Sequence, residues 1–414
     1  MISEKLLTLA EQAEDRLTAR FREFDRVALE NTQRVLTAFQ NARVSDACFA
    51  GTTGYGYDDL GRETLEKIYA EIFAAEAALV RVGFVNGTHA ITSALFALGV
   101  PGKKLLSVTG MPYDTLRTAI GIEGSAHGSL KYYGVGYAQI DLAADGGADL
   151  PAIAEAARDT DVCAVLIQRS RGYDTRRALT VEEIGEICDA VKRVNPQLPV
   201  FVDNCYGEFT QVIEPTHVGA DLVAGSLIKN PGGGLAPSGG YIVGKAELVE
   251  RAAARLTSPG IGGECGATLS VNRLLYQGLF MAPHVVAQAL KTAAFCAAML
   301  ENLGFPTSPG ALEQRSDIIQ MIELGSAENL QNFCAGVQAS SAVDSYVRPE
   351  PWQMPGYECP VVMAAGTFVQ GSSIELSCDG PVRPPFVAYM QGSLTYESGK
   401  LSVLHAISEM LDRK

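Results

Sequence analysis

The chain has 414 residues, 47% hydrophobic and 19% charged, which is ordinary for a globular protein with a large buried core. Its formal net charge of −14 argues against nucleic acid and anionic membranes as partners, because both attract basic surfaces. Neither the nine scattered cysteines nor the five histidines have metal-binding spacing, so no metal site is expected.

The first 45 residues are predicted to form a helical arm. Apolar residues such as Leu6, Leu17 and Phe24 recur there at helical spacing, with charged residues between them. We expect one or two amphipathic helices, packed against the same chain or against a neighbouring subunit.

A glycine-rich loop follows, with the sequence FAGTTGYGYDDLGRETLE, and a helix is expected to begin at Asp59 or Gly61. The loop carries Tyr55 and Tyr57. Loops supply many binding residues, but most loop tyrosines occupy surface turns. A structural role and a role at a binding site are therefore equally open at this point.

The segment VRVGFVNGTHAITSALFAL joins a strand-like run over residues 80–85 to an apolar helix that begins near His89. Gly87 and Thr88 lie at the start of that helix, where unpaired backbone N–H groups attract anions. An ordinary helix cap accounts for the same residues. We favour an anion site, since a small residue and a hydroxyl occur together there.

Strands and helices alternate in the next part of the chain. A strand is expected at KLLSVTG, followed by Tyr113, and further strands at 131–142 and 162–168. A helix should follow Thr180, which is placed to cap it with Glu183 three residues on. This alternation predicts a parallel sheet, with Tyr113 at its ligand-binding edge or in a purely structural role.

The stretch from Leu198 to Tyr241 holds the clearest candidate site. One strand-length apolar run ends at Asp203, and a second is followed by Lys229, with Ser226 three residues before the lysine. Open α/β sheets bind ligands at the carboxyl ends of their strands, so we expect this acid and this lysine at one sheet edge. The glycines at 232–234 are expected to let a flat ring or a phosphate approach the backbone.

An acid and a lysine placed in this way suit pyridoxal 5'-phosphate. That cofactor needs a lysine for a Schiff base with its aldehyde, and an acid that keeps its ring nitrogen protonated. A turn-capping Asp203 and a solvent-facing Lys229 are the structural alternative. Gly87 and Thr88 as phosphate contacts, with Tyr113 covering the ring, favour the cofactor.

A second, smaller domain is predicted after a long apolar helix at residues 287–303. Strands are expected at IIQMIEL, AGTFVQ and SIELSCD, with a final helix from Leu401. Arg348 and Arg383 lie beside prolines, which form stiff turns. Such turns can aim a guanidinium at a substrate carboxylate, although a lone arginine is more often a surface residue.

The motifs FVDNCYGEF, GSLIKNPGGG, GYGYDDLGRETLE and NGTHAI resemble those of fold type I pyridoxal-phosphate enzymes. More closely, the chain is similar to the bacterial aluminium-resistance or methionine γ-lyase-like family, related to the cystathionine lyases. The resemblance implies an α/β fold with a helical arm (1–45), a large cofactor domain (46–290) and a smaller α+β domain (291–414). The large domain would hold a mostly parallel sheet with helices on both faces.

The resemblance also implies roles for individual residues. Lys229 would bind the cofactor aldehyde and act as base, Asp203 would pair with the ring nitrogen, and Tyr113 would stack on the ring. Phosphate contacts would come from Gly87, Thr88 and Ser226, and from Tyr57 and Arg62 of a neighbouring subunit. Independently of the resemblance, we expect Tyr55 and Arg383 to contact the substrate. The protein would be a homodimer or homotetramer with shared active sites.

These features predict a lyase that eliminates a group from Cβ or Cγ of a sulfur-containing amino acid. An aminotransferase, an aldolase, a cysteine desulfurase and a non-catalytic cofactor-binding regulator are the alternatives. The flank Asn230-Pro231-Gly232 departs from the trans-sulfuration enzymes, so it leaves the substrate open. Scattered cysteines, no secretory leader and no apolar run of transmembrane length predict a cytoplasmic protein without membrane contact.

Overall fold

The computed structural model describes residues 2–124, 127–353 and 359–412. Its helices are α1 (Glu4–Asn41), α2 (Leu60–Ile72), α3 (Gly87–Leu98), α4 (Asp114–Ile120), α5 (Leu150–Ala156), α6 (Val181–Val194), α7 (Ala246–Leu256), α8 (Asn272–Asn302), α9 (Ala327–Ala339) and α10 (Tyr396–Asp412), with short 3-10 turns that include η3 (Asn230–Gly232). Its strands are β1 (Ala77–Arg81), β2 (Lys104–Ser107), β3 (Gly136–Gln139), β4 (Val162–Gln168), β5 (Val200–Asp203), β6 (Leu222–Ser226), β7 (Gly240–Gly244), β8 (Thr307–Ser308), β9 (Ile319–Glu323), β10 (Val361–Ala364), β11 (Ser377–Pro381) and β12 (Val387–Gln391).

The larger sheet is mostly parallel, as predicted. In the described part of the chain it has seven strands, in the order β1-β7-β6-β5-β4-β2-β3. Strands β2 to β6 pair in parallel, while β7 runs antiparallel to both β6 and β1. The carboxyl ends of β1 to β6 therefore share one edge of the sheet, where α/β sheets bind their ligands.

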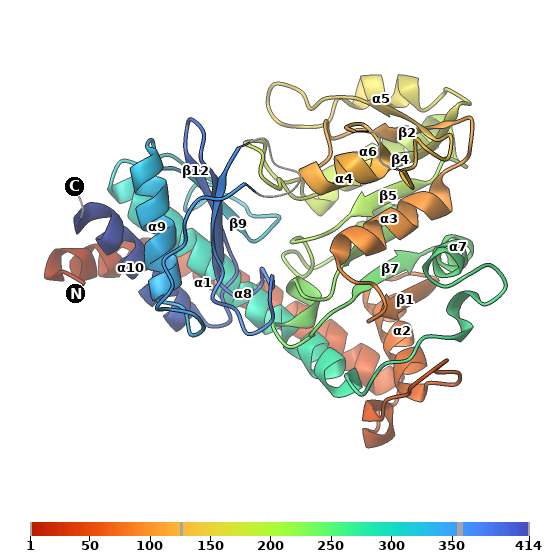
Figure 1. Ribbon diagram of the computed structural model, residues 1–414, viewed down its shortest axis with the longest axis horizontal. Helices are drawn as coiled ribbons and strands as arrows, with labels where there is room; N and C mark the ends of the chain where they lie inside the picture. The colour runs from red at the N-terminus through yellow and green to blue at the C-terminus, as the bar shows by residue number, and fades with distance from the viewer. Residues whose placement is uncertain (1, 125–126, 354–358, 413–414) are drawn as a thin grey trace.

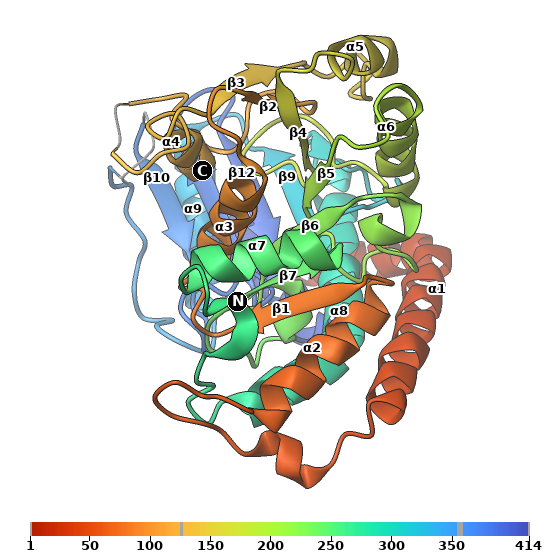
Figure 2. The same ribbon diagram turned by 90° about the vertical axis from the view of Figure 1, so that its right-hand side faces the viewer.

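Alternating side chains of the larger sheet fill two core layers. In β5, Val200 and Val202 face the layer that contains α6, whereas Phe201 faces the layer that contains α3 and α7. Successive strand residues point to opposite faces, so helices must cover both sides of a sheet with apolar residues at every position. Figure 2 shows α3 and α7 across the near face. Thr180 and Glu183 form the expected capping box of α6.

The smaller sheet is antiparallel, and its strand order is β10-β11-β12-β9-β8. Helix α9 covers this sheet on the side away from the larger one, and α10 packs on α9 and α8 (Figure 1). This arrangement is the smaller α+β domain that the sequence predicts.

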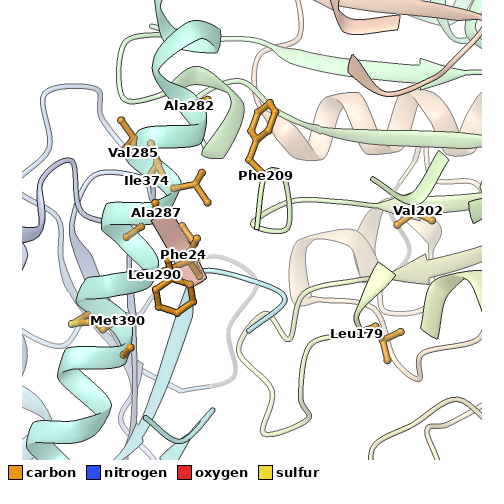
Figure 3. Packing of buried hydrophobic residues seen from close by; sticks show 14 of the residues in the cluster. Phe24, Leu179, Val202, Phe209, Ala282, Val285, Ala287, Leu290, Ile374 and Met390 are labelled. Carbon is orange, nitrogen blue, oxygen red and sulfur yellow. The ribbon is translucent and has the colours of Figure 1, made fainter. Parts of the chain in front are cut away.

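Helix α8 connects the two sheets, and α1 packs along it (Figure 1). Figure 3 shows Val285 and Leu290 of α8 in the same buried cluster as Phe24 of α1 and Met390 of β12. The predicted arm is therefore a single helix on its own chain. Helix α8 has the length and hydropathy of a membrane span, but 72% of its most apolar window is buried inside the protein.

Several element predictions need correction. The strand expected over 131–142 is only Gly136–Gln139, and no strand forms at 365–370. There the N–H groups of Phe368 and Val369 donate to the Glu375 carboxylate at 2.8 and 2.9 Å, which makes a turn instead of a ladder. The long helix expected at 287–303 begins earlier, at Asn272, and the boundary expected near residue 290 lies inside it. Residues 354–358, part of the proline-rich segment after Arg348, lie outside the described residues.

Candidate active site

A cavity of about 350 Å³ lies between the two sheets. One wall comes from the loops that follow β2, β4, β5 and β6 of the larger sheet. The opposite wall comes from Ile319, Arg383 and Gln391 of the smaller domain. Four residues predicted from the sequence line this cavity together, namely Tyr113, Asp203, Lys229 and Arg383.

Asp203 ends β5 at the floor of the cavity, with only 4% of its surface exposed. Its Oδ1 accepts a hydrogen bond from the backbone N–H of Cys205 at 3.1 Å. Burial raises the pKa of the carboxyl, and Lys229 and the Cys205 N–H act against that rise. A second cation beside Asp203 would oppose that rise in pKa and favour the ionised carboxylate.

Lys229 follows β6 and directly precedes the η3 turn. Its Nζ lies 3.8 Å from the centroid of the Tyr206 ring. Burial alone would lower the pKa of this amine, but neighbouring acidic groups outweigh it and raise the pKa well above its usual value; they are Cys205, Tyr206, Asp203 and Tyr113. The amine therefore lies in an environment that favours a proton.

Gly87, Thr88 and Ser226 lie together at one side of the site. A Cβ atom on Gly87 would lie 2.9 Å from the Cβ of Ser226, so glycine at the start of α3 leaves room for the serine. The Ser226 hydroxyl is buried and has no hydrogen-bond partner among the described residues. An unpaired buried hydroxyl beside a helix N-terminus fits a phosphate, which would accept from both.

Tyr113 joins this group to the cavity. Its hydroxyl and the Thr88 Oγ1 lie 2.7 Å apart in a hydrogen bond, and its backbone N–H donates to Gln168 Oε1 at 2.9 Å. Burial, with a smaller contribution from the Asp203 carboxylate, raises the pKa of the Tyr113 phenol. The phenol therefore keeps its proton at neutral pH and can donate it.

The glycines at 232–234 do not approach the cavity, which corrects the sequence prediction. A Cβ on Gly232 would lie 1.8 Å from the Leu227 carbonyl oxygen, and one on Gly278 of α8 would lie 2.3 Å from the Gly232 carbonyl oxygen. Glycines are needed at 232–234 because η3 packs directly on the backbone of α8. The role of these glycines is structural.

The two arginines beside prolines have different environments. Arg383 lines the cavity from the turn after β11. Arg348 instead donates to Asn332 Oδ1 at 3.0 Å and pairs with Glu409 at 3.2 Å on the surface of the smaller domain. Arg348 is therefore wrong as a candidate for the substrate carboxylate, whereas Arg383 stays one.

The tyrosine loop projects into solvent. Tyr55 and Tyr57 are 68% and 54% exposed, and their rings stack with centroids 5.4 Å apart. Neither is among the described residues that line the cavity of their own chain. Arg62 is buried and donates to the backbone carbonyls of Gly266 and Glu264 at 2.9 and 3.3 Å, so it fixes this loop, and its contact with a neighbouring subunit's phosphate stays a prediction.

Sequence reasoning missed several residues of the cavity. Tyr206, Tyr173, Gln168 and Gln391 all line it, and Arg176 donates to the Gln168 carbonyl behind it at 3.0 Å. They come from irregular turns or from the ends of strands. No spacing in the sequence separates such residues from surface tyrosines and glutamines.

The fold places the protein in a known structural class. The chain superposes on the pyridoxal-5'-phosphate dependent protein YhfS from Escherichia coli with a TM-score of 0.63 at 18% identity, covering 95% of this chain and 97% of that one. Its architecture is that of the fold type I pyridoxal-phosphate enzymes. Within that class, the chain belongs to the methionine γ-lyase family, whose sequence model matches residues 6–411.

Closer relatives share almost the full length. The uncharacterized protein YnbB of Bacillus subtilis is 49% identical over 412 residues, which is 99% of this chain and 98% of that protein. The crystal structure of a carbon–sulfur lyase involved in aluminium resistance from Clostridium novyi NT superposes with a TM-score of 0.96 at 49% identity. That match covers 99% of this chain and 97% of the other.

Proposed function

We propose that the protein is a pyridoxal-phosphate-dependent carbon–sulfur lyase that eliminates a sulfur leaving group from Cβ or Cγ of an amino acid. The observation that carries this proposal is the cavity shared by Lys229, Asp203, Tyr113 and Arg383. Membership of the methionine γ-lyase family and the likeness to a carbon–sulfur lyase support the same reaction.

The described residues fit pyridoxal phosphate at both of its ends. Ser226, Thr88 and the start of α3 would hold the phosphate, since the buried Ser226 hydroxyl has no partner among the described residues. Asp203 would pair with the ring nitrogen, and Lys229 would bind the aldehyde. When bound, the cofactor supplies an electron sink for the charge left on the substrate after loss of its α-proton.

Lys229 and Tyr113 are the groups suited to move protons. An amine whose pKa is raised is a strong proton acceptor once it is neutral, so Lys229 is suited to take the α-proton of the substrate. Tyr113 keeps its proton because burial raises the pKa of the phenol, so it can donate to a departing thiolate. Arg383 would bind the substrate carboxylate from the opposite wall.

The reaction can be tested by incubating the purified protein separately with L-methionine, L-cystathionine and L-cysteine. We expect at least one of them to yield a keto acid and ammonia in equal amounts, with a thiol or sulfide, and with no added amino acceptor. Turnover that requires an added keto acid would identify an aminotransferase instead. Lys229→Ala should abolish the visible absorbance of the lysine-bound cofactor, whereas Lys103→Ala, at an exposed lysine, should retain it.

We propose further that the protein forms a homodimer or homotetramer in which the tyrosine loop of one subunit completes the site of another. Two large aromatic side chains that stack in solvent, on a loop fixed by the buried Arg62, favour such a contact. Light scattering should report more than one chain per particle, and Tyr57→Ser should weaken cofactor binding. Free cysteines throughout the described chain support a reducing, cytoplasmic location.

A further inference from the structure

Tyr206 has an unusual place in the site. Its backbone φ is +71°, in the left-handed region that residues other than glycine rarely adopt. In this conformation the ring faces Lys229, with Nζ 3.8 Å from the ring centroid. Strained backbone of this kind persists where the surrounding structure holds it and is concentrated at functional sites.

The side chain of Asn230 holds this turn. Asn230 is fully buried, and its Nδ2 donates to the carbonyl oxygens of Tyr206 and Glu208 at 3.0 and 2.9 Å. Glu208 in turn accepts from the Tyr241 hydroxyl at 2.8 Å. The turn that presents the Tyr206 ring is thus tied to the residue immediately after Lys229. Asn230, the first residue of the Asn-Pro-Gly segment after the lysine, therefore holds the turn that carries Tyr206.

We propose that Tyr206 is a further residue of the site, whose ring face binds the ammonium form of Lys229, and that Asn230 is the positioning residue that keeps the ring there. A cation over the face of an aromatic ring within about 6 Å is attracted by the ring quadrupole, most strongly where water is excluded. The contact itself is independent of the reaction. Its role in catalysis rests on the proposed function.

In that reaction, Lys229 would take the α-proton of the substrate at Nζ while it is free of the cofactor. The ring of Tyr206 would then hold the resulting ammonium until the proton passes to a carbon of the product. Other groups also act on this amine, namely Asp203, Cys205 and Glu208 from the end of β5 and its following turn, and Tyr113 from the cap of α4. A test must therefore separate the ring from these neighbours.

The test measures the pKa of Lys229 in the full-length, cofactor-free protein. A small amine-reactive reagent is added over a range of pH, and the extent of labelling at Lys229 is read by mass spectrometry. Lys245, exposed and paired with Asp221 at 2.7 Å, is the internal standard in every sample. We compare wild type with Tyr206→Leu, Tyr206→Phe and Asn230→Ala, each checked for its fold by circular dichroism.

We expect Tyr206→Leu to lower the pKa of Lys229 by about one unit, as a desolvated cation–ring contact predicts. Tyr206→Phe keeps the ring face but removes the phenol that also raises the pKa of Lys229, so it should lower that pKa by less than Tyr206→Leu does. Asn230→Ala should lower it as well. An unchanged pKa in Tyr206→Leu, or equal shifts in the leucine and phenylalanine variants, would overturn the proposal. Absence of cofactor binding by the wild type would refute the proposed function alone.

Discussion

The phenol of Tyr173 donates to Asp379 Oδ2 at 2.7 Å, which joins the loop after β4 in the large domain to β11 in the small one. Gln391 Nε2 donates to the same oxygen at 3.1 Å. Tyr173 and Gln391 line the cavity, and Asp379 is buried behind them. A single carboxylate therefore fixes two cavity residues from opposite sides of the domain boundary.

Asp379 should make stability depend on pH. Burial raises its pKa from 3.8 to about 7. Well below pH ~4 the carboxyl is protonated in both the folded and the unfolded chain, so its ionisation takes nothing from the free energy of unfolding. As pH rises to 7 the unfolded chain loses the proton first, so the folded state loses roughly 3–4 kcal/mol.

Asp379→Asn should remove that loss, because an amide does not titrate and its oxygen can keep both hydrogen bonds. Urea unfolding should be measured from pH 4 to 8. The free energy of unfolding of the variant minus that of wild type should rise up to about pH 7 and stay constant at higher pH. Asp15→Asn, on the exposed face of α1, is the control and should show no such trend. Parallel stability curves for Asp379→Asn and wild type would contradict the assignment.

Ser226→Ala should separate cofactor binding from stability. The Ser226 hydroxyl is buried without a partner among the described residues, so its removal should leave the cofactor-free protein as stable as before, or slightly more stable. The same change should weaken pyridoxal-phosphate binding by about 10- to 100-fold, the value of a hydrogen bond to a charged group. Thermal unfolding without cofactor and titration with cofactor measure the two effects.

Gly87→Ala is the contrasting variant, since its Cβ would lie 2.9 Å from the Ser226 Cβ. It should lower both stability and cofactor affinity. Equal cofactor affinity in Ser226→Ala and wild type would remove Ser226 from the phosphate site.

The ends of the strands could be predicted from the sequence because they depend on the apolar residues of each strand itself. Asp203 and Lys229 each follow an apolar run that can only be buried in a sheet, and parallel strands bring such ends together. The same reasoning misjudged the glycines at 232–234, because their partner is Gly278 of α8, far along the chain, and no local pattern records that contact. Tyr206 was missed for a similar reason, since its orientation depends on a left-handed backbone held by Asn230.

Gly278→Ala tests the close packing of η3 on α8. A Cβ at this position would lie 2.3 Å from the Gly232 carbonyl oxygen, so one of the two segments must move. Overpacking of this kind costs about 1–3 kcal/mol, and the free energy of unfolding from urea titration should fall by that amount. Gln277→Ala, at the exposed neighbouring position of the same helix, is the control and should change stability little. A Gly278→Ala variant as stable as this control would show that η3 can move away from α8 without cost.

Arg383 and Arg348 offer a matched pair for substrate recognition. Both lie beside prolines, yet only Arg383 lines the cavity, whereas Arg348 pairs with Glu409 at 3.2 Å on the surface. Arg383→Ala should lower kcat/KM by about 10- to 100-fold, mainly through KM, because a charge-assisted bond to the substrate carboxylate is lost. Arg348→Ala should leave both constants unchanged, since surface ion pairs contribute about 0–1 kcal/mol to stability and nothing to the cavity. Equal kinetics for the two variants would show that another cationic group binds the carboxylate.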